Sequence, residues 1–189
     1  MLSIRTVLLA ASLAAAQTPT KAPVTFYGVT FPAEIAGAVS ISVRDYEQTS
    51  PGLGYSVGYR GGNQTSTVYI YDERQSTIPD DLQAPIVKAQ FEQAKGDIVA
   101  AGRQGLFAKV EAKGDWTVAD ARGRTRFTCT AFVLAAKDRP GELDSHVCLG
   151  VVNNKFFKFR ITGSQRPSAA ADVKAFVEAW ANLLWSGAT

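Results

Sequence analysis

Three stretches rich in β-branched and aromatic residues follow one another between residues 125 and 163, and they predict a three-stranded antiparallel meander. Its turns are Asp138 to Gly141 and the two-residue loop Asn153-Asn154, which tolerates positive φ. Because successive side chains of a strand point to opposite faces, the position of a turn sets the register of its hairpin. With these turns at the centres, Cys129 lies opposite Cys148, and Cys148 lies opposite Phe159.

This register divides the meander into two faces of different character. On the apolar face, Gly150 leaves room for neighbouring phenyl rings. The members of this face are Phe127, Cys129, Ala131, Val133, Cys148, Phe157, Phe159 and Ile161. The other face is mixed, so we expect it to be covered in part and wet in part. Its members are Thr128, Thr130, Phe132, Val147, Leu149, Phe156, Lys158 and Arg160.

The C-terminal segment carries the strongest helix pattern of the chain. Apolar residues recur at a spacing of 3.6 residues from Val173 to Leu184, after Pro167 and a capping Ser168. We expect the apolar stripe of this amphipathic helix to cover the Phe157 and Phe159 face of the meander. The alternative, a helix lying on a membrane surface, lacks the basic polar face that such helices usually carry.

A second helix is predicted to follow Ile78-Pro79 and to run to about Gly102. Asp80 or Asp81 would serve as its N-cap, and Pro85 comes early enough in the helix to be tolerated. The apolar stripe that supports this helix consists of Ile86, Val87, Phe91, Ala94 and Ile98.

Several further strands are predicted outside the meander. The range 24–31 indicates one strand that ends at Pro32, and the range 39–46 alternates Val39, Ile41 and Val43 with polar residues. Two short strands are predicted at 106–112 and 116–119. Together with the two helices, these elements predict an α+β fold with an antiparallel sheet.

A tyrosine-rich hairpin is predicted from Gly54 to Asp72, with its strands joined through residues 61–65. The expected register places Tyr55 and Tyr59 on the same face as Tyr69 and Tyr71. That face would be an aromatic platform for a sugar, a peptide or a ring-bearing ligand. The alternative is ordinary cross-strand pairing of tyrosines, which stabilises a half-buried sheet without any ligand.

The first residues of the chain have the pattern of a secretory signal peptide. One arginine precedes an apolar run that ends in Ala14-Ala15-Ala16, and the run is too short to span a membrane. We therefore expect cleavage near Ala16, a flexible leader at 17–23 and one α+β domain at 24–187. The protein would then be periplasmic or secreted, and no other stretch is apolar and long enough to predict a transmembrane span.

Charge adds little to this picture. The formal net charge is +3, and loss of residues 1–16 removes only Arg5, which leaves +2. Such a small and dispersed charge does not indicate a nucleic-acid partner.

The two cysteines of the chain are expected to form a disulfide. Cys129 and Cys148 oppose each other on neighbouring strands, and an oxidising compartment favours the bond over two buried thiols. A free Cys148 assisted by His146 would instead suggest a small thiol enzyme. Three ligands from His146 and the two cysteines are few for zinc, so neither a metal nor a cofactor is predicted. Asp144, Ser145 and His146 alternate between faces and therefore do not form a catalytic relay.

Four short motifs carry a resemblance to known proteins. They are Phe31-Pro32, Pro51 to Tyr55, Thr67 to Tyr71, and Lys158 to Gly163 before the C-terminal helix. Their combination resembles small exported bacterial proteins of unknown function, and the order of elements is distantly similar to the PsbP-like α/β/α sandwich. The resemblance implies a curved antiparallel sheet with a helix on each side. It also implies a binding or assembly role, since the PsbP-like group is used mainly in that way and the motifs carry over no catalytic residues.

The residues and the resemblance together lead to one main functional hypothesis. The chain is expected to be an exported binding or assembly-accessory module for an unknown protein or small molecule. The candidate surface consists of Tyr55, Tyr59, Tyr69, Tyr71, Phe156, Lys158 and Arg160. The alternatives are the thiol enzyme based on His146 and Cys148, and a carrier that holds an apolar ligand between sheet and helix.

Overall fold

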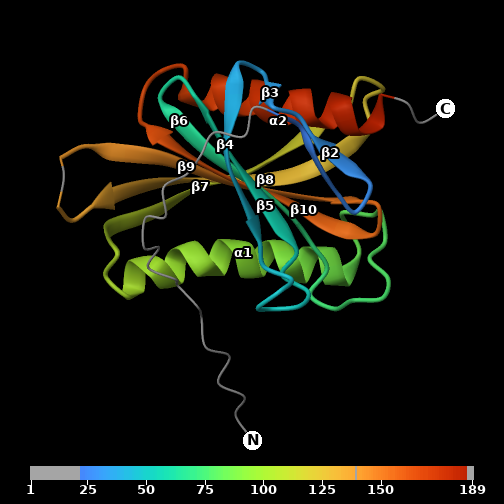
Figure 1. Ribbon diagram of the computed structural model, residues 1–189. Helices are drawn as coiled ribbons and strands as arrows, with labels where there is room; N and C mark the ends of the chain where they lie inside the picture. The colour runs from blue at the N-terminus through green and yellow to red at the C-terminus, as the bar shows by residue number, and fades with distance from the viewer. Residues whose placement is uncertain (1–21, 139, 187–189) are drawn as a thin grey trace, which may run out of the picture.

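The computed structural model describes residues 22–138 and 140–186, and its main feature is an eight-stranded antiparallel sheet between two helices (Figure 1). The strands lie in the order β3-β4-β5-β6-β10-β9-β8-β7. Their bounds are Glu34–Ile35 (β3), Ala38–Asp45 (β4), Tyr55–Gly61 (β5), Gln64–Tyr71 (β6), Phe107–Ala119 (β7), Thr125–Ala136 (β8), Glu142–Val152 (β9) and Lys155–Ser164 (β10). Helix α1 (Pro85–Arg103) covers one face and helix α2 (Ala169–Trp185) covers the other. The predicted α+β sandwich is confirmed. The signal peptide, most of the leader and residue 187 lie outside the described residues.

The register of the meander β8-β9-β10 is the predicted one. Cys129 pairs with Cys148, and Cys148 pairs with Phe159. The loop residues Asn153 and Asn154 both have positive φ, as the two-residue hairpin requires. A Cβ atom on Gly150 would collide with the Phe127 ring and with the backbone of the neighbouring strand. A glycine is therefore required at this position.

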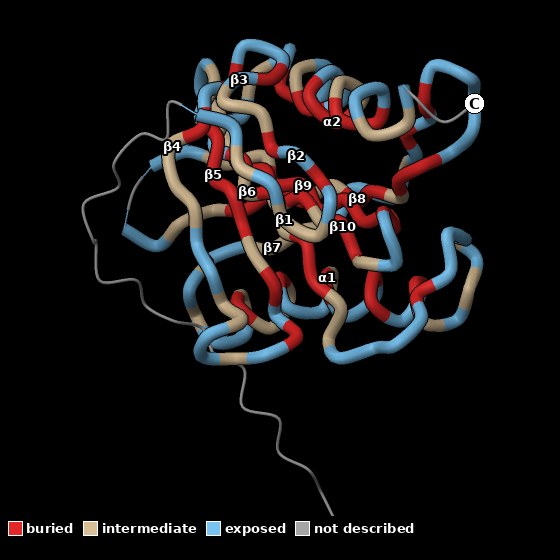
Figure 2. Tube along the Cα trace, turned by 45° about the vertical axis from the view of Figure 1, so that its right-hand side comes forward, coloured by how far each residue is buried: buried red, intermediate tan, exposed pale blue. Residues whose placement is uncertain are grey.

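Helix α2 covers the apolar face of the meander, as predicted. Its buried residues Phe176, Val177 and Trp180 pack in one cluster with Phe157 and Phe159. On the other face, α1 packs with β7 and β9, and Val87, Phe91 and Ile98 meet Phe132, Val147, Leu149 and Phe156. The buried positions accordingly gather in the strands and on the inner sides of both helices (Figure 2).

The predicted register of the tyrosine hairpin is wrong by one residue. Tyr55 pairs with Ile70 rather than with Tyr71, because the loop consists of two residues, Gly62 and Asn63. Gly62 has φ +54°, and a glycine at the first loop position is the mark of the tight type II′ turn. A shift of one residue moves every side chain of a strand to the opposite face. Tyr69 and Tyr71 consequently face α1, while Tyr55 and Tyr59 face the α2 side.

Helix α1 begins three or four residues later than predicted. Ala84 precedes Pro85 and has an extended conformation with ψ 137°, because the proline ring disfavours a helical residue before it. Pro85 is therefore the first helical residue, and the two aspartates do not cap the helix. Asp81 instead accepts a hydrogen bond from the backbone N–H of Gln83. Asp80 forms ion pairs with two arginines, Arg124 and Arg126.

Three strand predictions also need correction. Residues 24–31 form a separate hairpin, β1 (Val24–Phe26) and β2 (Val29–Phe31), because Tyr27 and Gly28 adopt positive φ and turn the chain back. Residues 107–119 form the single strand β7, in which bulges absorb the interruption near Gly114. A further irregularity between Ser40 and Ser42 shifts the alternation of β4 and leaves Val39 exposed.

Candidate ligand-binding pocket

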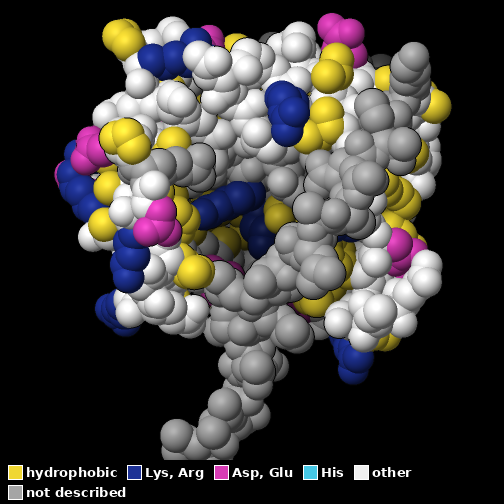
Figure 3. Space-filling view, turned by 60° about the vertical axis from the view of Figure 1, so that its left-hand side comes forward, with side chains coloured by type: hydrophobic (Ala, Val, Ile, Leu, Met, Phe, Trp, Pro, Cys, Tyr) yellow, Lys and Arg dark blue, Asp and Glu magenta, His cyan; other side chains and the backbone are white. Residues whose placement is uncertain are grey.

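A pocket of about 380 Å³ opens between the C-terminal half of α1 and the sheet. It exists because α1 packs along β7 and β9 and leaves part of β10 and β6 uncovered on this face. Its lining residues come from α1, from the segment after α1 and from four strands, β6, β7, β9 and β10. They are Tyr69, Ala94, Asp97, Ile98, Ala101, Leu106, Phe107, Val147, Lys158 and Arg160. On one side of the molecule, Lys and Arg side chains are visible inside a hollow (Figure 3).

Two cationic side chains of β10 line the pocket. Lys158 and Arg160 are two residues apart on one strand, so both side chains point to the face that α1 covers, about 7 Å from each other along the strand. Lys158 pairs in the sheet with Tyr69 of β6, and Arg160 pairs with Thr67. A central strand therefore holds both cations in place.

The Lys158 ammonium lies over two tyrosine rings, with Nζ 5.0 Å from the ring centroids of both Tyr69 and Tyr71. Burial lowers the pKa of Lys158, and the carboxylates of Asp97 and Glu73 only partly oppose this shift. Arg160 lowers the pKa of Lys158 further, so the two cations affect each other. Aromatic faces stabilise the ammonium but accept no conventional hydrogen bond from it.

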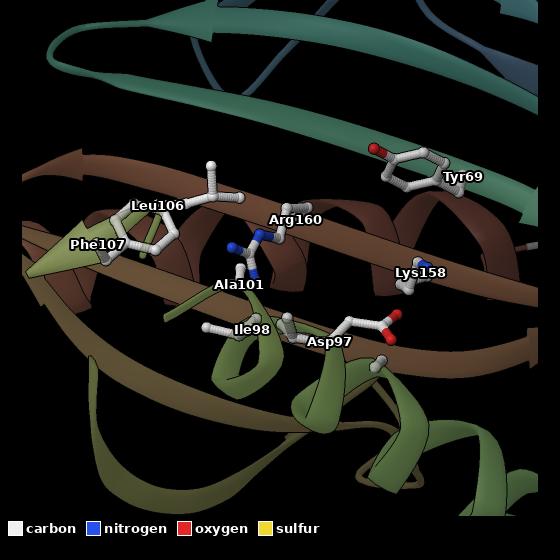
Figure 4. A pocket seen from close by; sticks show the side chains of 10 residues that line it. Tyr69, Asp97, Ile98, Ala101, Leu106, Phe107, Lys158 and Arg160 are labelled. Atoms are coloured by element: carbon white, nitrogen blue, oxygen red, sulfur yellow. The ribbon is translucent and has the colours of Figure 1, made fainter. Parts of the chain in front are cut away.

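Arg160 is more weakly satisfied. Within residues 22–138 and 140–186, its guanidinium donates no hydrogen bond and forms no ion pair. Burial also lowers the pKa of Arg160. An arginine nevertheless stays protonated in a protein, and its five N–H donors normally have acceptors. In Figure 4, the guanidinium extends from β10 toward α1, above Ala101. These donors are available to a ligand.

Asp97 stands on α1 at the rim of the pocket, and Figure 4 shows its carboxylate on the side of Lys158. Partial burial of the carboxyl group raises the pKa of Asp97, while Lys158 and Arg160 lower it, although the residue as a whole remains exposed. The carboxylate forms no ion pair within 4.0 Å of either cation. It therefore balances part of the positive charge without occupying the donors of Arg160.

The rest of the pocket is apolar. The α1 side consists of Ala94, Ile98 and Ala101, whose short or buried side chains leave space beside the sheet. Phe107 and Leu106 border the opening, and Leu106 is 48% exposed. The pocket thus joins a cationic end to an apolar body, a combination found in many small-molecule sites.

The structure divides the predicted candidate surface. Tyr69, Lys158 and Arg160 line the pocket, and the neighbouring Tyr71 and Phe156 are buried beneath α1. Tyr59 and Tyr55 lie on the other face. Tyr59 donates a hydrogen bond to the Pro32 carbonyl at 2.9 Å, and Tyr55 stacks on Phe26 with ring centroids 4.1 Å apart.

The sequence reasoning missed Asp97 and the apolar wall. Asp97 borders the stripe formed by Ala94, Ile98 and Ala101, so its helical position was readable from the sequence. Ala94 and Ala101 also indicated that this side of the helix carries short side chains. No local pattern in the sequence, however, indicated which strand this side of the helix faces.

The cysteine and histidine site is closed. Cys129 and Cys148 form a disulfide, and both residues are fully buried. His146 is 5% exposed and meets the edge of Trp116 at a ring distance of 6.2 Å. Burial lowers the pKa of His146, which favours the neutral ring. This arrangement offers no free thiol, so it gives no support to the thiol-enzyme alternative.

Among the described residues, no group of three or more His, Cys, Asp or Glu is arranged to hold a metal ion. None of the helices in this part of the chain has both the length and the apolar character needed to cross a membrane.

Comparisons with known proteins give structural similarities only. The solution structure of cyanobacterial PsbP (CyanoP) from Synechocystis sp. PCC 6803 is 16% identical, with 89% of this chain and 93% of that chain covered and a TM-score of 0.47. The Saccharomyces cerevisiae Ran-binding protein Mog1p is 15% identical over 89% of this chain and 92% of that chain, with a TM-score of 0.40. CyanoP is by name a member of the PsbP group, which is the group that the order of elements in the present chain resembles. No family model matches the chain, and no curated protein matches it.

Proposed function

We propose that this chain is an exported, non-catalytic binding module that holds a small molecule in the pocket lined by Lys158 and Arg160. One observation carries the proposal: a rigid central strand presents two cations to a cavity, and the guanidinium of Arg160 has no acceptor among the described residues. Arg160 is half-buried and lines the pocket, so its donors are accessible from the cavity. A ligand with an acceptor group would satisfy these donors.

The pocket favours binding over catalysis. Catalysis by proton transfer or nucleophilic attack needs a base or a nucleophile close to the substrate. The polar groups that line the pocket are two cations, a tyrosine and one rim carboxylate. Burial raises the pKa of Tyr69, so its hydroxyl remains protonated and serves as a donor.

The ligand of this proposal differs from the wholly apolar cargo considered from the sequence. On the α2 side, Trp180, Phe157 and Phe159 are fully buried and pack against one another. The pocket on the α1 side contains the guanidinium of Arg160, to which an uncharged apolar cargo would offer no acceptor.

Export is the second part of the proposal. It is supported by the signal-peptide pattern at residues 1–16 and by a disulfide of the kind found in oxidising compartments. Fractionation of the native host, followed by intact-mass measurement, tests this part. We expect a chain shortened near Ala16 outside the cytoplasm, and a full-length cytoplasmic chain would contradict export.

Binding is tested on protein purified from its own host. Native mass spectrometry should show a fraction with a bound small molecule that is lost on denaturation. The Ala101→Phe variant, which fills the pocket, should lack this fraction, while the matched Ala175→Phe variant on the exposed side of α2 should keep it. If no variant and no wild-type sample carries a ligand, and the protein instead co-purifies only with other proteins, the small-molecule proposal is wrong.

A further inference from the structure

Charged and apolar groups both line the pocket. Among the residues that line the pocket, Lys158 and Arg160 supply two positive charges and Asp97 supplies one negative charge, so the lining carries one net positive charge. Glu73 lies outside the lining and offsets part of the charge of Lys158. Opposite charge lowers the energy of a desolvated charged group, while a like charge raises it. The polar end therefore matches a ligand with a single negative charge.

The position of Arg160 adds a geometric preference. A guanidinium presents its N–H groups as a planar fork, which matches the two oxygens of a carboxylate. Lys158 is held over the rings of Tyr69 and Tyr71 and acts as a neighbouring point charge. Because each cation is destabilised by burial, an anion that reaches Arg160 gains from both.

The apolar wall sets the rest of the ligand. Ala101, Ile98 and Val147 line the inner part, and Leu106 and Phe107 continue the apolar surface to the opening. The volume of about 380 Å³ lies near the lower end of the range of small-molecule pockets, about 300–1,000 Å³. An alkyl or aryl body of modest size fits this space and would shield the exposed Leu106 from water.

We infer that the ligand is an amphiphilic monoanion, a carboxylate on a short alkyl or aryl body, with its head group at Arg160 and Lys158 and its apolar body between Ala101 and Leu106. This inference rests on the proposed binding function and adds the chemical class of the ligand to it. A fully hydrophilic anion would leave the apolar wall unused, and an uncharged lipid would leave Arg160 without an acceptor.

Isothermal titration calorimetry with three probes tests the inference: octanoate, octan-1-ol and acetate, each titrated into purified protein. Octanoate has both parts of the proposed ligand, octanol lacks the charge and acetate lacks the body. We expect octanoate to bind at least about tenfold more tightly than octanol, since a charge-assisted hydrogen bond contributes about 1.5–3 kcal/mol. Acetate should give no measurable binding. Equal affinities for octanoate and octanol would overturn the inference.

Charge variants give a sharper test than affinity alone. Arg160→Gln should weaken octanoate binding about tenfold or more and leave octanol unchanged. Asp97→Asn should tighten octanoate binding severalfold, because it removes a like charge at the rim. A purely structural role of either residue would change the octanoate and octanol affinities together.

The matched control is Lys174→Gln on α2, which removes one positive charge from an exposed position on the far face of the sheet. It should leave the octanoate affinity unchanged, because the inference attributes binding to the charges in the pocket and not to the net charge of the protein. If Arg160→Gln and Lys174→Gln behave alike, the polar end of the pocket does not bind the anion and the inference is wrong. A host ligand seen by native mass spectrometry but lacking a carboxylate would overturn the inference and leave the binding function standing. The absence of any host ligand would instead contradict the binding function itself.

Discussion

The two faces of the sheet are built from the same strands and have opposite characters. On the α2 face, Trp180 makes ring contacts with Phe31, Tyr59, Phe157 and Phe159, and all five side chains are almost completely buried. On the α1 face, the side chains of the cluster around Phe91 and Phe156 are also buried, but the pocket opens next to them, beside Ala101.

Strand β10 shows how one segment serves both faces. Phe157 and Phe159 point into the α2 core, while Lys158 and Arg160 point to the pocket. The α2 face is therefore organised for stability, and the open part of the α1 face carries charges whose burial is unfavourable. Function commonly opposes stability at a binding site, and the proposed ligand would offset this unfavourable burial.

The largest expected difference between the faces comes from truncating one buried side chain on each helix. Trp180→Ala should lower the free energy of unfolding by about 4 kcal/mol, because it leaves a large cavity in a closed core. Ile98→Ala should lower it by about 2 kcal/mol, because the removed atoms border a space that is already open. Urea denaturation measures both values. Equal losses would show that the α1 face is as tightly packed as the α2 face.

The disulfide lies on the α2 face and should be next in magnitude. Its two cysteines are 19 residues apart, and the chain-entropy relation gives about 3 kcal/mol for a loop of this length. The double variant Cys129→Ala with Cys148→Ala should lose this amount. The pocket lies on the other face, so the octanoate affinity of the folded variant should be that of the wild type.

Adding the same group to each helix compares the packing directly. Ala181→Leu should destabilise the protein by about 2 kcal/mol, because Ala181 is fully buried against the α2 core. Ala101→Leu should change stability by less than about 0.5 kcal/mol, since the added methyl groups enter the pocket. Thermal unfolding followed by circular dichroism checks the pair. A strongly destabilised Ala101→Leu would contradict the pocket.

The smallest expected effect is a gain in stability. Lys158→Met removes a charge that burial disfavours and should stabilise the protein by about 1 kcal/mol while weakening octanoate binding. The sign of the pH dependence follows from the lowered pKa of Lys158. Between the folded pKa and the ordinary lysine value of about 10.4, the unfolded chain binds more protons, so the wild type gains stability as pH rises through that window.

The advantage of Lys158→Met should therefore be present near pH 7 and should shrink as pH approaches about 10. Urea denaturation at several pH values measures this trend. An advantage that stays constant with pH would mean that the ammonium is not destabilised in the folded state. Lys88→Met, on the exposed side of α1, is the matched control for the loss of one lysine.

Local patterns predicted the meander well and the tyrosine hairpin poorly. Between the two clearly apolar strands of the meander, Asn153 and Asn154 offer a single turn position, so the register followed from the turn. In the hairpin, Gly61, Gly62 and Asn63 offer several turn centres, and a one-residue difference reverses the faces. The proposed platform failed for that reason, although Tyr69 remained part of the pocket.

By itself the sequence determined the alternation along β10, the pairing of Cys129 with Cys148 and the helical stripe that contains Trp180. These features depend on neighbours in the chain and on the periods of strands and helices, which a sequence shows directly. Only the tertiary structure decided that α1 lies over β7 and β9 and brings Asp97 and Ala101 opposite Lys158 and Arg160. That decision depends on packing between segments about 60 residues apart in the sequence, where side-chain volumes and helix position, rather than any local period, create the cavity.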